Sequence, residues 1–250
     1  MKKLFYILVY LIPFIGYSQS ENKIFNEANT FYKENNFERA IGLYLSIEEQ
    51  GLESAELFFN LGNSYYKQNK VAPAIYYYEK ALKLNPNHKD ALINIEFAKR
   101  MKIDVIEEMP TTFLQKFSKN VIQKLTFDSW AILAVIASFL ASILFLLYHF
   151  SNSSRKKLVY FNFTIFFVFA LIITMFFAFN SYDIDKKNRP AIIFSTKVEI
   201  KNAPTLASDE VFELHEGTKV QVLDELEDWK KIKIADGKEG WIASTHLKEI

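Results

Sequence analysis

The chain has 250 residues, half of them hydrophobic, and carries 24 Phe and 13 Tyr but no Cys. The absence of cysteine excludes disulfides, thiolate nucleophiles and Cys-ligated zinc, and a formal net charge of +1 argues against a nucleic-acid-binding protein, which would carry a basic surplus. Because the apolar residues gather in blocks, we predict a chain built from several segments rather than one globular core.

The N-terminal stretch has the three parts of a secretory signal peptide. Two lysines precede the 12-residue apolar stretch Leu4–Ile15, and the small residues Gly16 and Ser18 follow it. As a helix, the apolar stretch would be about 18 Å long, which is short of the roughly 30 Å hydrocarbon core of a bilayer. We therefore predict a cleaved signal peptide over residues 1–18; an uncleaved anchor is the alternative.

The next segment contains an internal repeat. Residues 28–44 and 62–78 align with an offset of 34, and 7 of the 17 aligned residues are identical. This period and pattern resemble the tetratricopeptide repeat, a pair of antiparallel helices. We place two copies at residues 21–54 and 55–88, with small residues where the two helices of a pair cross and tyrosines beside them. The residues that carry the resemblance are Ile24, Ala28, Phe31, Ala40 and Tyr44 in the first copy, and Phe58, Leu61, Gly62, Tyr65, Ala74, Tyr78, Ala81 and Pro86 in the second.

A third copy begins but does not continue. In residues 89–102, Glu96 stands where the pattern needs a small residue and Lys99 where it needs an aromatic one. A charged residue at the crossing point excludes a following partner helix. We therefore expect residues 19–102 to form a short all-α solenoid that ends in a capping helix with a polar outer face.

The first helix of each repeat is expected to line the concave face of the solenoid, and spacings of four, three and one place its exposed residues on one stripe. Paired asparagines in this stripe can donate to and accept from the backbone of an extended peptide. Family members that clamp a C-terminal carboxylate also use basic residues, where this chain has Phe25, Ile93 and Phe97, which argues against a clamp. A polar stripe on a packing scaffold is the alternative. The residues of this groove stripe are Phe25, Asn29, Tyr32, Lys33, Phe59, Asn63, Tyr66 and Lys67.

Residues 103–129 are expected to be a linker that contains an amphipathic interfacial helix. After Pro110, four apolar residues follow helical spacing opposite three lysines, a pattern typical of a helix that lies at a membrane surface. A helix of a soluble bundle would have the same pattern. The apolar residues are Leu114, Phe117, Val121 and Leu125, and the lysines are Lys116, Lys119 and Lys124.

Two stretches without formal charge, residues 130–150 and 158–179, are each long enough to cross a bilayer. The first carries Ala134, Ser138 and Ser142 at intervals of four, and small residues at this spacing allow another helix to approach closely. The second contains eight Phe. We predict a transmembrane helical hairpin in which the Phe-rich helix packs over the Ala/Ser face.

The turn between the spans, residues 151–157, ends in Arg155, Lys156 and Lys157, and such charges favour the cytoplasmic side. Lysines also flank the other ends of both spans, so these charges alone do not decide the orientation. If the signal peptide directs export, the repeats lie outside, the first span re-enters the membrane, and the turn lies inside. We therefore predict a multi-pass protein of the bacterial inner membrane, with both folded domains in the periplasm.

The last part of the chain, residues 190–250, alternates apolar and polar residues in short runs and contains the hairpin-turn signal Asp236-Gly237. It resembles the bacterial SH3-like family, which implies a small all-β barrel. Trp229 and Trp241 are candidates for a peptide- or glycan-binding platform; the alternative is that one or both fill the barrel. The residues that carry the resemblance are Val198, Ile200, Lys201, Pro204, Leu214, Gly217, Val220, Trp229, Gly237, Gly240, Trp241, Ile242 and Leu247.

The order of these segments resembles that of BatE-type proteins of the aerotolerance (Bat) operon, and stretches such as LHEGTKVQVLDELEDWKKIKIADGKEGWI carry the resemblance. It implies a non-enzymatic membrane scaffold that acts with MoxR-type ATPases and with von Willebrand A-domain membrane proteins. Stable interfaces use roughly 20 to 30 residues a side, more than the predicted turn offers. We therefore expect the ATPase to be reached only through the membrane partners.

An enzyme is the alternative of a different class, because SH3-like domains often accompany cell-wall hydrolases. The four His lie in different segments, and no HExxH, GxSxG or Walker-type motif occurs. We therefore expect no catalytic residues, no metal and no cofactor. A second binding hypothesis is a cell-wall sensor or anchor, whose SH3-like domain would hold peptidoglycan.

Overall fold

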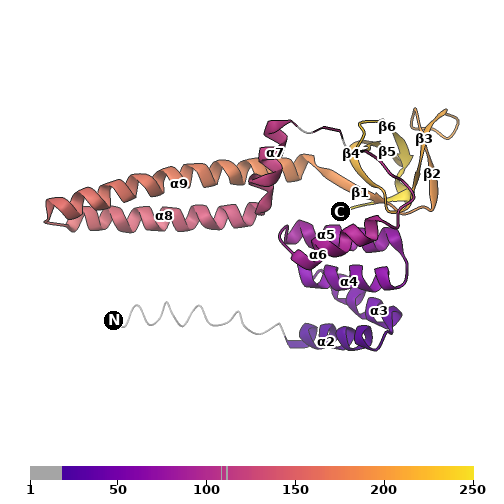
Figure 1. Cartoon of the computed structure of the whole chain (residues 1–250), viewed down its shortest axis with the longest axis horizontal. Helices are drawn as coiled ribbons and strands as arrows, with labels where there is room; N and C mark the ends of the chain where they lie inside the picture. The colour runs from indigo at the N-terminus through magenta and orange to yellow at the C-terminus, as the bar shows by residue number, and fades with distance from the viewer. Residues whose placement is uncertain (1–18, 108, 111) are drawn as a thin grey trace.

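The computed structural model describes residues 19–107, 109–110 and 112–250, so the predicted signal peptide lies outside the described residues. Figure 1 shows three parts, which are a stack of short helices, a long antiparallel helical hairpin and a small β-sheet. The stack and the sheet lie at the same end of the hairpin. The predicted fold class, an all-α repeat solenoid joined to a helical hairpin and a small all-β domain, is confirmed.

The stack contains two helical pairs and one closing helix. The turns inside the two pairs are alike, because Asn35 and Asn69 both adopt positive φ, at 62° and 59°. Asparagine tolerates this left-handed region better than most residues do, so the same turn recurs one repeat later. The helices are α2 Gln19–Lys33, α3 Phe37–Glu48, α4 Ala55–Lys67, α5 Val71–Leu84 and α6 Lys89–Lys99.

Small residues set the distance between the two helices of each pair, as the sequence predicted. A Cβ atom added to Gly62 of α4 would lie 2.6 Å from two ring carbons of Tyr78 on α5. Carbon atoms in contact are normally 3.5–4.0 Å apart, so α4 and α5 can cross this closely only where α4 has no side chain. In the first pair, Ala28 and Ala40 are completely buried beside Tyr44.

The hairpin consists of α8 Phe127–Phe150 and α9 Ser154–Lys187, and both are long and apolar enough to cross a membrane. The turn between them is shorter than predicted. It comprises only residues 151–153, because Arg155, Lys156 and Lys157 belong to the first turn of α9. The three positive charges therefore sit on a helix end, beside the turn.

The predicted Ala134/Ser138/Ser142 face is only partly correct. Ala134 is buried against α9, but Ser138 and Ser142 are exposed, and the Ser142 hydroxyl donates to the Ser138 carbonyl. The residues buried with Ala134 are Ala137 and Ala141. Steps of three and four keep residues on one side of a helix, whereas repeated steps of four turn about 40° further around it each time. The residues of a helix–helix packing seam are therefore spaced by alternating steps of three and four.

The segment before the hairpin forms α7 Phe113–Asn120 and the 3₁₀ turn η1 Ile122–Lys124. Phe117 of α7 packs edge-on against Phe177 of α9, with ring centroids 6.5 Å apart. The indole N–H of Trp130 in α8 donates to the carbonyl oxygen of Ile122 at 2.9 Å. These contacts hold the short helix against the end of the hairpin, and its role at a membrane surface stays a prediction.

The β-sheet begins two residues after α9 ends, so it follows directly from the second span. All of its strand pairs are antiparallel, in the order β3-β2-β6-β5-β4-β1-β7. Alternate residues point into a core that includes Ile200, Ile232 and Ile242, each completely buried. The strands are β1 Arg189–Ile193, β2 Lys197–Lys201, β3 Glu210–His215, β4 Lys219–Leu226, β5 Trp229–Lys233, β6 Glu239–Ala243 and β7 Leu247–Glu249, with the 3₁₀ turn η2 Ser244–His246 before β7.

Candidate functional site

The sheet packs directly on the helical stack, a contact that the sequence did not indicate. Ile192 of β1 is completely buried in a cluster with Ile75 and Tyr78 of α5 and with Ile95 of α6. Gly217 permits this approach, because a Cβ there would lie 3.0 Å from Val71, and its φ of +82° also favours glycine. The repeats and the sheet therefore form one body, which we call the outer body.

A polar contact fastens the linker after α6 to the sheet. The Asp104 carboxylate accepts hydrogen bonds from the His215 backbone N–H at 2.7 Å and from the Thr218 hydroxyl at 2.6 Å, and its other oxygen lies 2.7 Å from His215 Nδ1. Burial raises the pKa of Asp104, but the hydrogen bonds from Thr218 and His215 lower this pKa by more, so the net direction is downward. Further along, Ile106 packs on the core of the sheet.

The two asparagines of the groove stripe have a different role from the one predicted. Asn29 Oδ1 accepts from the Tyr44 hydroxyl at 2.6 Å and from Asn60 Nδ2 at 3.0 Å. One repeat later, Asn63 accepts in the same way from Tyr78 at 2.7 Å and from Asn94 at 2.8 Å. Each amide oxygen thus joins the two helices of its own pair and links them to the next repeat.

The expectation that these asparagines can both donate to and accept from a bound peptide is therefore wrong, because their amide oxygens already accept two hydrogen bonds each. A sequence signal for this network exists. Asn60 and Asn94 are themselves 34 residues apart, so a second asparagine recurs at the repeat period. The network is buried enough that the pKa of Tyr44 rises to about 12, mainly through burial.

The rest of the groove stripe divides into packed aromatic residues and exposed lysines. Phe25 packs on Tyr44, with ring centroids 5.7 Å apart, and Phe59 packs on His88 at 4.7 Å. Tyr32 lies edge-on to Phe37 at 5.4 Å, and Tyr66 is half-buried. Lys33 and Lys67 are exposed at equivalent places, at the C-terminal ends of α2 and α4.

The outward face of the β5–β6 hairpin carries both tryptophans. Trp229 lies opposite Ala243 and Trp241 lies opposite Lys231, so the two indoles are diagonal neighbours on the same face. The alternate residues, such as Ile232 and Ile242, are the ones that point into the core. Filling the barrel is therefore not the role of either tryptophan, and both are half-buried on its surface.

Comparison with known families fits this division of the chain. Residues 55–88 match the tetratricopeptide repeat, and residues 196–248 match the bacterial SH3 domain. No curated protein matches the chain. Tetratricopeptide repeats and bacterial SH3 domains are typically non-catalytic, and they point to protein–protein interaction, with cell-wall binding as a further role for the SH3 domain. Within the described residues, no group of three or more His, Asp or Glu could hold a metal ion.

The closing helix of the repeats, α6, differs from the polar cap that was predicted. Glu96 and Lys99 do form an ion pair at 2.8 Å on its surface. Around them, however, Leu92, Ile93 and Phe97 are 45%, 55% and 46% exposed. Ile93 and Phe97 are equivalent to Phe59 and Asn63 one repeat earlier, so the third helix extends the groove stripe with apolar side chains.

Proposed function

We propose that this protein is a non-enzymatic scaffold of the bacterial inner membrane, whose outer body binds protein partners in the periplasm. The observation that carries the proposal is the arrangement of the outer body. The SH3 domain is packed on α5 and α6, whereas the accessible lysines of the groove stripe lie on α2 and α4. With the hairpin in the membrane, this packing would hold the repeat groove near the membrane surface in a fixed orientation.

The partners that we propose are membrane proteins of the Bat type, which carry von Willebrand A-domains, in a complex linked to aerotolerance and stress. The order of segments supports this assignment. A MoxR-type ATPase would join the complex through those partners, because only residues 151–153 connect the two spans and stable interfaces use roughly 20 to 30 residues a side.

The groove offers a partner two kinds of contact. Lys33 and Lys67 present positive charge, and Ile93 and Phe97 present apolar surface on the adjoining helix α6. A peptide with acidic and apolar residues fits this combination. Asn63 is a poor probe of such binding, because replacing it would also break the bonds that join the repeats.

The test is capture of the membrane partners from solubilised membranes by the tagged full-length chain. A variant with Lys33→Glu and Lys67→Glu reverses two exposed charges and should lower partner recovery several-fold. Lys23→Glu is the control, because Lys23 is also exposed on α2 but lies about 80° around the helix and about 15 Å along its axis from Lys33. Equal recovery by the two variants would place the partner surface outside the groove.

The SH3 domain supports a second candidate function, cell-wall binding, because Trp229 and Trp241 share one outward face. Aromatic faces pack well on the apolar faces of sugars and peptides, and half-buried indoles are already ordered for this contact. If the domain holds peptidoglycan, the full-length protein should sediment with purified wall sacculi, and Trp229→Ala with Trp241→Ala should abolish this. Sedimentation that the double variant leaves unchanged would exclude this face.

A further inference from the structure

The linker between α6 and α7 crosses the SH3 domain as an extended strap, residues 103–107 (Figure 1). The side chains of Asp104 and Ile106 turn toward the domain. Ile103 and Val105 turn away from it and are 65% and 92% exposed. This alternation is that of a β-strand laid on a surface. The exposure of Val105 also means that no other described part of the chain covers the strap.

The SH3 domain has a built site for the carboxylate of the strap. One Asp104 oxygen accepts from the His215 backbone N–H at 2.7 Å and from the Thr218 hydroxyl at 2.6 Å, and the other lies 2.7 Å from His215 Nδ1. Both residues belong to the turn between β3 and β4, and Thr218 is only 1% exposed. Three donors from one turn thus converge on one anionic group. Because the Asp104 pKa is lowered overall, the site favours the charged carboxylate over the neutral acid.

The contacts continue along the linker. Ile106 packs on the core of the SH3 domain, but the buried residues of that core all come from the domain itself. The Met109 N–H donates to the Ala235 carbonyl oxygen at 3.1 Å, in the turn between β5 and β6. The domain therefore has a complete core without the linker, and the linker contacts it as a ligand does, at two turns and one apolar patch.

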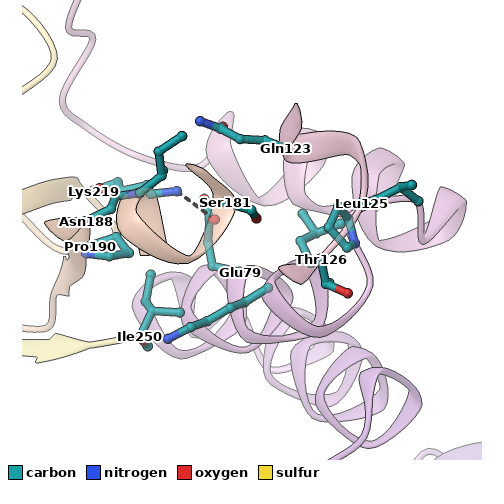
Figure 2. A pocket seen from close by; sticks show the side chains of 13 residues that line it. Glu79, Gln123, Leu125, Thr126, Ser181, Asn188, Pro190, Lys219 and Ile250 are labelled. Carbon is teal, nitrogen blue, oxygen red and sulfur yellow. Dashed lines mark hydrogen bonds and ion pairs between the residues drawn. The ribbon is translucent and has the colours of Figure 1, made fainter. Parts of the chain in front are cut away.

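Other contacts hold the SH3 domain on the repeats. Ile192 of β1 is completely buried against α5 and α6. Lys219, which follows Thr218, forms an ion pair with Glu79 of α5 at 2.7 Å, and Figure 2 shows this pair. The strap can therefore leave its site while the outer body stays assembled, which is what exchange with another ligand requires.

We propose that the turn between β3 and β4, with the apolar patch beside it, is a peptide-binding site of the SH3 domain. Its ligand is an extended segment of a partner protein with an aspartate and, two residues later, an aliphatic residue. Residues 104–106 occupy the site in cis. An empty site would leave the buried Thr218 hydroxyl without a partner, which is costly, so a carboxylate from one source or the other fills it.

The strap competes strongly with such a partner, because it is tethered to the rest of the chain at both ends. A short tether gives an effective concentration on the order of millimolar. A partner's segment displaces the strap only if it binds tightly or is brought close by a second contact. Binding of the partner to the repeats would supply that contact, a step that rests on the proposed function, whereas the site itself does not.

The test measures binding of a fluorescein-labelled peptide, with the sequence of residues 102–107, to the full-length chain in detergent by fluorescence anisotropy. The open variant, Asp104→Ala with Ile106→Ala, removes both inward side chains of the strap. It should bind the peptide at least tenfold more tightly than the parent chain, in which the strap competes. The peptide with Asp104→Asn should bind the open variant about tenfold more weakly, because it lacks the charge, whereas the peptide with Val105→Ser should bind equally well.

Two changes in the open variant locate the bound peptide. Thr218→Val should lower binding several-fold, because it removes one donor of the site, and Lys33→Glu in the groove stripe should leave binding unchanged. Asp104→Asn in the chain is a second strap variant that keeps the size of the side chain, and slow hydrogen exchange in β5 checks that the SH3 domain stays folded.

Equal binding of the peptide by the parent chain and both strap variants would overturn the proposal. Equal binding of the Asp104→Asn peptide, or a loss with Lys33→Glu but not with Thr218→Val, would do the same. Partner capture by the repeats is measured separately, so either result can fail alone.

Discussion

Adding one methyl group should have opposite effects at two glycines of the repeats. Gly42 lies inside α3 with no atom within 4 Å of an added Cβ, whereas the same Cβ at Gly62 would lie 2.6 Å from the Tyr78 ring. Replacing a helical glycine by alanine stabilises a helix by about 1 kcal/mol. At Gly62, however, the Tyr78 ring must move by roughly 1 Å to reach a normal carbon contact of about 3.5 Å.

Tyr78 has little freedom to move, because it is completely buried and its hydroxyl is bonded to Asn63. Overpacking of this kind costs typically about 1–3 kcal/mol. We therefore expect Gly42→Ala to stabilise the repeats by about 0.5–1 kcal/mol and Gly62→Ala to destabilise them by about 1–2 kcal/mol.

Hydrogen exchange of the α4 and α5 amides in the full-length protein measures both changes, since slow exchange reports the free energy of opening. Gly62→Ala should speed exchange in α4 and α5, and Gly42→Ala should leave it unchanged or slow it in α3. If both variants slow exchange equally, the close helix crossing does not limit the size of residue 62 and the packing argument fails.

Three further predictions concern polar contacts. Asp104→Ala removes the hydrogen bonds that fasten the linker to the SH3 domain, and losing these bonds to a charged group should cost about 3 kcal/mol. Faster hydrogen exchange of the His215 backbone amide would report this loss. Folding lowers the Asp104 pKa from its ordinary value of 3.8, so this stabilisation should be complete above pH 3.8 and be lost as the pH falls through the lower pKa of the folded state. The same hydrogen-exchange experiment, repeated over a range of pH, measures this loss. A loss of stabilisation that begins near pH 7 would contradict the prediction. Tyr44→Phe removes one donor to Asn29 and should cost about 1 kcal/mol, and no change in α2 and α3 exchange would show that the bond contributes nothing.

The parts of the fold that the sequence predicted are those with a local period. The 34-residue offset identified the helical pairs, and it identified Gly62 as a crossing point because the packing constraint recurs in each repeat. The hairpin was also predicted from a local feature, the length of its two apolar stretches. The four-residue spacing of small residues wrongly predicted that Ser138 and Ser142 contact the second helix of the hairpin, because the buried residues are spaced by alternating steps of three and four.

Contacts between the parts could not be predicted in this way. Asp104 and His215 are 111 residues apart, and neither belongs to a repeating pattern. Gly217 was recognised only as a residue of the SH3-like domain, although it also permits the approach of α5. For the groove, exposure was inferred from helical spacing alone, which does not reveal that the Asn29 and Asn63 side chains reach the neighbouring helices.

The periplasmic position of the outer body can be tested directly, because the chain has no native cysteine to remove. Single cysteines would replace Lys67 in the repeats, Leu206 in the SH3 domain, which is 84% exposed, and Ser153 in the turn. Intact spheroplasts would be treated with a membrane-impermeant maleimide. We expect labelling at positions 67 and 206 before lysis, and at position 153 only after lysis. Labelling of position 153 in intact spheroplasts, with 67 and 206 protected, would contradict it.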